Sequence, residues 1–314
     1  YGIIPKDAMK ETANSGNSEE MNEMINHHLD DCVAFFRKNK HRSRKFLLEK
    51  ENKVMKHIYS ILVKFLGQPP KEVSWAMSTE DDEPQIFSGL SPLQFKQLTM
   101  PSMNINNDFI VLVNMPHLDY YQNYKLNGAK NIYNGPDCMF FNVPMNELTR
   151  YTTKSVLSGI AVWFAGDVSK HFNWWHSTLD DELDQSEKVF GTTKNFSKGE
   201  RMLLRNVQAN HAMAFTGVNL DEKKKPMEWQ VENSWGYWDN ETPGMDGFLT
   251  MSQSWFEKYV IMTVIHRKLL TKTMERKSLR EPKTLNCWDF ITPALKVRVV
   301  NPPIKYLNLR KSSK

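Results

Sequence analysis

The residues best suited to chemistry lie between residues 210 and 249, where a histidine and an asparagine stand at the ends of two expected strands. His211 begins an alternating, mostly apolar run that is typical of a β-strand, and a polar connection leads to a second short strand at residues 229–232. A hairpin of this kind brings His211 and Asn233 together at one end of a sheet. An imidazole held by a side-chain amide is the base-and-orienter pair of a nucleophilic triad.

The amide in such a pair fixes the tautomer and the plane of the ring without adding a charge. The imidazolium is then stabilised chiefly by a partner thiolate. A plainer alternative is that His211 is a hydrogen-bonded core residue, which is the common fate of a single histidine in an apolar strand. The order of the neighbouring motifs bears on this choice.

That order resembles a known family of peptidases. N-H-A-M-A-F-T-G-V followed by W-Q-V-E-N-S-W-G is similar to the His/Asn half of the papain-like cysteine peptidases, and closer still to the bleomycin hydrolase and aminopeptidase C group. The segments Y-G-I-I-P-K-D-A-M, M-N-E-M-I-N-H-H-L, A-V-W-F-A-G-D-V-S-K-H-F and E-K-V-F-G resemble the same group, in register from Tyr1 to about Leu295. The resemblance implies that His211 acts as base and then acid, that Asn233 orients its ring, and that Trp235 shields their hydrogen bond from water.

The resemblance also implies a cysteine nucleophile, and no segment of the printed sequence matches the family's pattern around it. Cysteine is a good nucleophile only as a thiolate, beside a histidine or at a helix N-terminus. Cys32 lies in an expected helix beside two carboxylates, which disfavour a thiolate. Cys138 is expected in a loop, and Cys287 precedes Trp288 near the end of the chain, where the dipeptide is a coincidence. We therefore expect the nucleophile to precede Tyr1, and no peptide hydrolysis from this chain alone.

Two functions remain open at this point. The first is a cytosolic cysteine aminopeptidase similar to bleomycin hydrolase, which hydrolyses peptide substrates through a thioester and, by the resemblance, forms a homohexamer. The alternative is a catalytically inactive homologue that serves as a structural or binding subunit of a larger assembly. The sequence upstream of Tyr1 distinguishes them, since a glutamine followed by a Cys-Trp pair indicates the enzyme, and Ser, Gly or Ala at the cysteine position indicates the subunit.

Composition limits the class of protein. The chain has 314 residues, of which 25% are charged and 40% apolar, and its net charge of +5 is too small to establish a nucleic-acid partner. The three widely spaced cysteines argue against a disulfide framework and for a reducing, cytoplasmic compartment. No apolar run is long enough to span a bilayer, so no membrane partner is expected. Neither the histidines nor the glycines form a pattern that indicates a metal or another cofactor.

The elements that precede the His–Asn pair begin with helices. Apolar residues at helical spacing predict helices at residues 18–39 and 43–66, which together form an antiparallel hairpin. The basic residues 37–45 lie between them. We expect this stretch to be a solvated connection, and phosphate binding to a nucleic acid is the alternative.

Later segments alternate between short helices and strands. Residues 117–134 are expected to be irregular or a hairpin, and Asp167, Lys170 and His171 follow a strand end, where they are candidates to line a site. Further strands are expected at residues 73–75, 109–114 and 160–164, and helices at residues 91–98 and 145–157.

The sequence therefore predicts an α+β protein of the papain-like cysteine peptidase fold, with a helical hairpin insertion and an antiparallel, barrel-like sheet that carries His211 and Asn233. Four parts are expected: an extended lead-in from a missing N-terminal lobe (1–17), the helical hairpin insertion (18–70), the β-rich catalytic portion with a C-terminal arm (71–295), and a basic extension (296–314). In the resembling enzymes the carboxylate of this arm limits cleavage to aminopeptidase action. The basic extension would prevent that placement unless it is removed.

Overall fold

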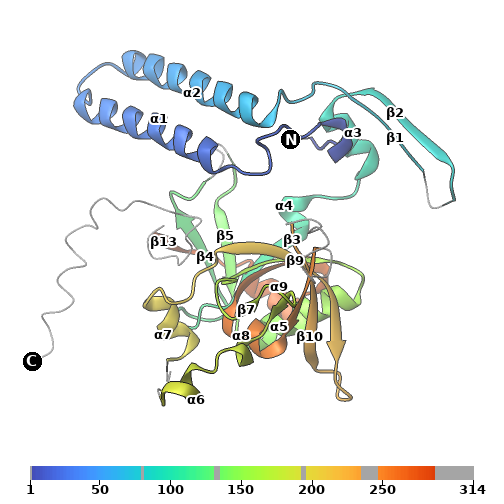
Figure 1. The fold of residues 1–314 in the computed structure, drawn as a ribbon. Coiled ribbons are helices and arrows are strands. Elements are labelled where there is room, and N and C mark those ends of the chain that lie inside the picture. Colours follow the sequence, from blue (N-terminus) through green and yellow to red (C-terminus); the bar gives the residue numbers. More distant parts are fainter. Residues whose placement is uncertain (1, 79–80, 131–134, 192–195, 235–246, 287–314) are drawn as a thin grey trace, which may run out of the picture. The chain divides into compact units, whose positions relative to one another are not determined.

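The chain folds as two compact units, residues 1–103 and 104–314. The computed structural model describes residues 2–78, 81–130, 135–191, 196–234 and 247–286. Unit 1 combines a long helical hairpin with a small two-stranded sheet, and unit 2 is built on a large sheet with helices packed against it (Figure 1).

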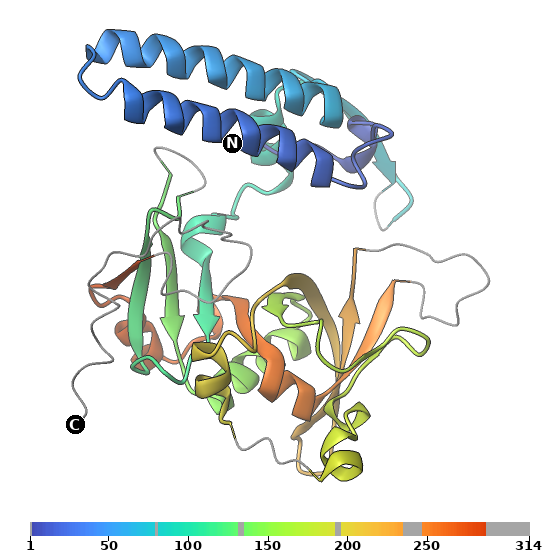
Figure 2. The ribbon, with the colours of Figure 1, turned by 60° about the vertical axis from the view of Figure 1, so that its left-hand side comes forward.

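The helical hairpin of unit 1 consists of α1 (Glu19–Lys38) and α2 (Arg44–Leu66), which lie side by side in opposite directions (Figures 1 and 2). Ser43 caps α2 by accepting a backbone hydrogen bond, and Gly67 ends the helix in a conformation with φ of 85° that glycine adopts readily. The buried contact between the helices is made by Cys32, Val54 and Ile58. The two helices predicted from apolar spacing are thus confirmed.

The remainder of unit 1 is a small sheet with one covering helix. Its elements are η1 (Lys6–Ala8), β1 (Val73–Ser78), β2 (Pro84–Leu90) and α3 (Pro92–Thr99). The strand predicted at residues 73–75 continues to Ser78 and pairs antiparallel with β2, which the sequence did not indicate. Only Phe87 of β2 is buried, so the strand lacks the alternation by which half-buried strands are recognised.

Unit 2 starts with a short helix and then builds its sheet. Its elements are α4 (Ile105–Asp108), β3 (Phe109–Val113), β4 (Gln122–Asn127), β5 (Cys138–Asn142), α5 (Met145–Leu157), β6 (Val162–Gly166), β7 (Phe172–Asn173), β8 (Thr178–Leu179), η2 (Asp181–Leu183), α6 (Ser186–Phe190), α7 (Lys198–Leu203), β9 (His211–Leu220), β10 (Pro226–Glu232), β11 (Phe248–Ser252), α8 (Gln253–Tyr259), β12 (Val260–His266), η3 (Arg267–Leu269), α9 (Lys272–Ser278) and β13 (Lys283–Asn286).

The described strands of unit 2 form one sheet in the order β13-β4-β5-β3-β12-β6-β9-β10-β11-β8-β7. Its central part, from β3 to β11, is antiparallel throughout, as predicted, while β13/β4, β3/β5 and β11/β8 are parallel pairs. Because β6 and β12 run in opposite directions, and β6 and β9 do too, the end of β6 lies beside the starts of β9 and β12. This edge of the sheet carries the residues discussed below.

The loop expected at Cys138 was wrong, because Cys138 lies in strand β5. The hairpin alternative for residues 117–134 holds in part, since they contain the regular strand β4, which pairs antiparallel with β5. The polar side chains of β4 concealed it, because the buried Asn123 amide is satisfied by tertiary contacts: it donates to the carbonyl oxygens of Ser278 and Arg280 at 2.6 and 2.7 Å. A strand with such partners needs no apolar alternation.

Gly166, at the end of β6, fits a space that tolerates no side chain. A Cβ atom there would lie 2.8 Å from the carbonyl oxygen of Tyr259 and 3.3 Å from the Cα atom of Val260. Gly166→Ala is expected to lower the free energy of unfolding by about 1–3 kcal/mol, because backbone on the neighbouring strand must move. Urea unfolding followed by tryptophan fluorescence measures this. Gly16→Ala is the control, since its added methyl group meets nothing within 4 Å and its stability should change little.

Candidate active site

The two residues singled out from the sequence meet at the edge of the sheet. His211 is the first residue of β9, and Asn233 follows directly after the last residue of β10. The Nε2 atom of His211 lies 2.9 Å from the Oδ1 atom of Asn233, within hydrogen-bonding distance. Asn233 is buried, and its backbone amide donates to the carbonyl oxygen of Gly247 at 2.8 Å. The asparagine is therefore held in place by the backbone of the next strand.

A β-bulge brings these two side chains to the same face. Gln230 pairs with Gly217, but the next residue, Val231, pairs with Phe215, so β9 contains one extra residue, Thr216. Continuing the first register would place Asn233 opposite Ala214, on the other face of the sheet from His211. A shift by one residue exchanges the faces of a strand, and a bulge produces such a shift. After the bulge, Asn233 and His211 are diagonal neighbours on one face, which is within reach of two polar side chains.

The hydrogen-bond pattern assigns the tautomer of the neutral ring. The Oδ1 atom of Asn233 also accepts from the backbone amide of Ser234 at 2.8 Å. Because an amide N–H only donates, the atom facing it must be the carbonyl oxygen, and that same oxygen faces the imidazole. Nε2 of His211 is therefore the donor, and in the neutral ring Nδ1 carries the lone pair. This tautomer can accept a proton at Nδ1 while Asn233 holds Nε2.

Asp167 braces the backbone just before the histidine. Its buried carboxylate accepts from the Nδ2 atom of Asn210 at 2.6 Å and from the backbone amide of Gln208 at 3.1 Å. The side-chain oxygen of Asn210 in turn accepts from the amide of Val168 at 3.0 Å. These bonds tie the end of β6 to the residue that precedes His211. The sequence suggested Asp167 only as a lining residue; the structure gives it this positioning contact.

The other predicted lining residues and Cys138 lie away from the His–Asn pair. Lys170 and His171 line a pocket at the same sheet edge, without His211. Cys138 lies on β5, separated from β9 by β3, β12 and β6, which corresponds to roughly 19 Å at the usual strand spacing. Desolvation raises the pKa of its thiol, which opposes nucleophilic reactivity. Cys32 is buried in α1.

Several predicted features lie outside the described residues. Trp235, the proposed shield of the His–Asn bond, is among them, as are Cys287 and the basic extension 296–314. In the described part of the chain, no group of three or more histidine, cysteine or acidic side chains is arranged to hold a metal ion. The described helices include none that is long and apolar enough to cross a membrane.

A second histidine, His117, is expected to make the stability of the protein depend on pH. Its Nδ1 atom is buried without a hydrogen-bond partner among the described residues, and burial lowers its pKa. The folded state therefore binds fewer protons than the unfolded chain below about pH 6.5, and stability is lost as the pH falls through that value. We expect a smaller decrease in Tm between about pH 7.5 and 5.5 for His117→Gln than for the natural sequence, measured by differential scanning calorimetry.

The acidic groups do not interfere with that measurement. Hydrogen bonds from Lys258 and Ser254 outweigh the effect of burial on Asp181 and lower its pKa, so its stabilising contribution is lost only below about pH 4. The same holds for Asp137, whose pKa is lowered by Lys130. An equal decrease in Tm for both proteins above pH 5.5 would show that His117 does not carry the effect.

Comparisons with known proteins find relatives that match most of the chain. The model of the peptidase C1-like family matches residues 1–292. Aminopeptidase C of Listeria monocytogenes serovar 1/2a is 30% identical over 291 residues, and human bleomycin hydrolase is 31% identical over 297 residues; each match covers 92% of this chain. The chain spans 64% of the length of either relative.

A solved structure shares the fold. The crystal structure of PepW from Lactobacillus rhamnosis HN001 has a TM-score of 0.85 and 28% sequence identity, and the match covers 93% of this chain and 65% of that one. The predicted α+β, papain-like fold is thereby confirmed, as is the predicted likeness to bleomycin hydrolase and aminopeptidase C.

Proposed function

Because the chain belongs to the peptidase C1-like family, we propose that it supplies the histidine and asparagine of a cysteine aminopeptidase similar to bleomycin hydrolase. The observation that carries this proposal is the hydrogen bond between Nε2 of His211 and Oδ1 of Asn233. An oriented imidazole whose other nitrogen can accept a proton is what a thiol nucleophile requires. The names of the relatives, an aminopeptidase and a hydrolase, support the same reaction class.

The proposed reaction is acyl transfer through a thioester. Nδ1 of His211 takes the proton of a cysteine thiol, and the thiolate attacks the carbonyl carbon of the peptide bond. The imidazolium then gives this proton to the leaving amine as the C–N bond breaks, which leaves an acyl-thioester. His211 next removes a proton from water, the hydroxide attacks the thioester, and the thiol and the free carboxylic acid are released. Asn233 keeps the plane and the tautomer of the ring constant during formation of the thioester and during its hydrolysis.

The cysteine nucleophile of this proposal is not Cys138. The relatives are longer than the chain, and Cys138 lies on β5, which three strands separate from β9. We therefore propose that residues 1–314 alone have no peptidase activity, and that the natural protein adds the cysteine and an oxyanion-binding glutamine. Trp235 shields the His–Asn pair in this proposal.

Location, assembly and further partners are part of the same proposal. The spacing of the three cysteines supports a reducing, cytoplasmic location. We infer a homo-oligomer of the hexameric kind that the family resemblance implies, with peptides as substrates. Nucleic acid is a further candidate partner, supported by six basic side chains at residues 37–45 that make no ion pair with a described residue, and its binding should weaken steeply with added salt.

An active-site-directed thiol probe tests the enzymatic proposal. The natural protein, including whatever precedes Tyr1, is treated with an epoxide probe, and the labelled residue is identified by mass spectrometry. We expect one labelled cysteine outside residues 1–314 and loss of labelling in His211→Ala. A natural protein with Ser, Gly or Ala at the matching position, and no labelling, would instead support a catalytically inactive subunit of an assembly.

A further inference from the structure

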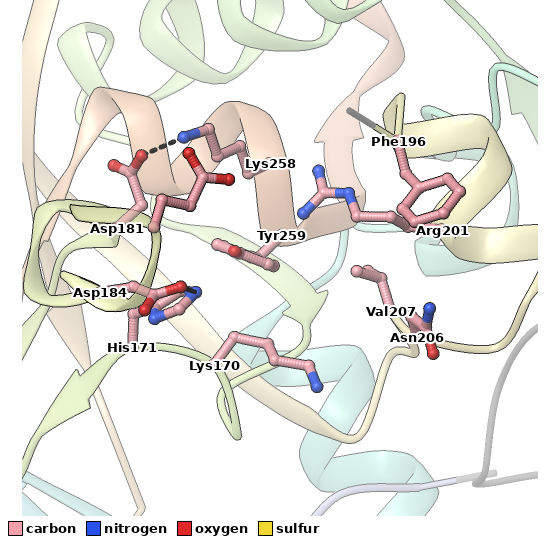
Figure 3. Close-up of a pocket in the computed structure, with 11 residues that line it drawn as sticks. Lys170, His171, Asp181, Asp184, Phe196, Arg201, Asn206, Val207, Lys258 and Tyr259 are labelled. Atoms are coloured by element: carbon pink, nitrogen blue, oxygen red, sulfur yellow. Dashed lines mark hydrogen bonds and ion pairs between the residues drawn. The ribbon is translucent and has the colours of Figure 1, made fainter. Parts of the chain in front are cut away.

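A pocket of about 590 Å³ opens at the sheet edge that carries His211, and it is formed by other residues. Lys170 and His171 follow β6, Val207 precedes β9, and Tyr259 ends α8 just before β12 (Figure 3). Residues from α6 and α7 complete it. Its volume lies in the range of small-molecule binding sites.

Charge is divided between two sides of this pocket. In Figure 3, Asp181, Asp184 and His171 lie on one side, while Arg201 and Val207 lie on the other. The acidic side is partly neutralised within the protein, because Lys258 pairs with Asp181. Nε2 of His171 lies 3.8 Å from a carboxylate oxygen of Asp184, which is an ion pair only when the ring is protonated. Glu187 adds a further carboxylate to the lining. Since an ionised carboxylate has about four acceptor positions, these groups can still accept a hydrogen bond from a ligand.

The cationic side is not neutralised in this way. Neither Arg201 nor Lys170 forms an ion pair with any residue that the structure describes. The guanidinium carbon of Arg201 lies 5.3 Å from the ring centroid of Tyr259, which orients it without supplying a counter-charge. Its Nε atom is buried and has no hydrogen-bond partner in the described part of the chain. A buried donor without a partner is costly. Because protein covers the Nε atom, a ligand would meet the other nitrogens of this guanidinium group, which lines the pocket.

The lining also offers apolar surface between the charges. Val207 and Tyr259 are buried residues whose side chains reach the pocket, and the exposed Phe196 lies at its other side. In Figure 3 the Lys170 side chain extends from beside His171 toward Asn206, below Tyr259. A ligand that spans the pocket therefore meets carboxylates at one end, cations at the other and apolar surface between them.

We propose that this pocket binds a short peptide or free amino acid as a zwitterion, with its α-carboxylate at Arg201 and Lys170 and its ammonium group toward Asp184 and Glu187. The guanidinium group presents paired N–H donors that match a carboxylate, and such charge-assisted bonds are among the stronger ones in proteins. The inference rests on the cavity and its charges and does not depend on the peptidase proposal, because binding requires no nucleophile.

Binding of glycyl-phenylalanine to the 314-residue chain tests this assignment by isothermal titration calorimetry. We expect saturable binding at millimolar or lower concentration. Replacing the ligand's carboxylate by an amide should weaken binding by about 10-fold or more, because a charge-assisted pair is lost. Arg201→Gln should have a similar effect, and Lys170→Gln a smaller one. Arg276→Gln is the matched control, an exposed arginine outside the pocket, and it should bind as the natural sequence does.

Several outcomes would overturn the assignment. These are no saturable binding, equal affinity for the dipeptide and its amide, or unchanged affinity in Arg201→Gln. Should Arg201→Gln lose its near-ultraviolet circular dichroism, the ligand amide and Lys170→Gln still decide the question. His211→Ala separates this pocket from the site of the proposed peptidase: unchanged affinity places the ligand away from the imidazole, whereas lost affinity assigns the binding to His211 and refutes the proposal.

Discussion

Replacing His211 by alanine in the natural protein is expected to lower kcat/KM for aminoacyl-amide substrates by at least about 10³-fold. The imidazole acts twice in the proposed reaction, first as the base that forms the thiolate and then as the acid that protonates the leaving amine. Both steps lose their proton carrier when the ring is removed. The measurement is release of a fluorescent amine from the substrate, with the concentration of folded enzyme determined independently.

Asn233→Ala should have a smaller effect, about 10²-fold, because the ring remains but is no longer held in one tautomer. The loss of a single tautomer can also be measured without any catalytic reaction. In the 314-residue chain, nitrogen chemical shifts of the imidazole should show a proton on Nε2, and Asn233→Ala should give a mixture of the two tautomers. A proton mainly on Nδ1 in the unmodified chain would contradict the hydrogen-bond assignment.

His41→Ala is the control for both substitutions, because His41 is exposed and lies in the connection between α1 and α2 of unit 1. It should retain activity and stability. A loss below 10-fold in His211→Ala, with full activity in His41→Ala, would mean that the histidine is not the proton carrier, and the plainer interpretation of a hydrogen-bonded strand residue would hold.

The sequence located the His–Asn pair because the information is local. His211 and Asn233 lie 22 residues apart. The first begins one strand and the second follows the end of the next, so the alternation of apolar residues and one polar connection suffice to predict that they meet. The bulge at Thr216 was not predicted, although it decides the face on which Asn233 lies. Gly217 was a signal for it: a Cβ atom there would lie 3.1 Å from Cβ of Gln230, and a glycine inside a strand often marks a bulge or close approach.

Features that depend on residues far apart in the sequence could not be predicted from it. The contact between Asp167 and Asn210 spans 43 positions, and the pocket collects side chains from Lys170 to Tyr259. In the sequence, a charged residue that lines a pocket looks the same as one exposed to solvent. Only the contacts made in the folded chain distinguish the two. For the same reason the segment that contains β4, with its buried Asn123, was expected only as irregular structure or a hairpin.

The strand that begins with His211 also carries a side chain whose loss should strongly destabilise unit 2. Phe215 is fully buried, and its ring centroid lies 3.9 Å from that of Phe164 and 4.9 Å from that of Trp229. Trp229 stacks in turn on Phe256 of α8, at 4.9 Å. Phe215 therefore joins β6, β9, β10 and α8 in a single aromatic cluster.

Phe215→Ala is expected to lower the free energy of unfolding of unit 2 by about 3–5 kcal/mol, since the lost apolar burial is added to the cost of the cavity. Urea unfolding followed by circular dichroism measures the change. Phe190→Ala is the matched control: that ring is 75% exposed, and its removal should change stability by less than about 0.5 kcal/mol.

Phe215→Ala should also affect the hydrogen bond between His211 and Asn233. Phe215 lies on the same face of β9 as His211, directly opposite Val231 after the bulge. Removing its ring loosens the contact that holds β9 to β10 in the register on which the His–Asn bond depends. At urea concentrations where the variant is still folded, the imidazole of Phe215→Ala should therefore show the mixed tautomers expected for Asn233→Ala. A strongly destabilised variant with an unchanged Nε2 proton signal would show that the bulge and the Asn233 backbone hydrogen bond to Gly247 hold the pair without the aromatic cluster.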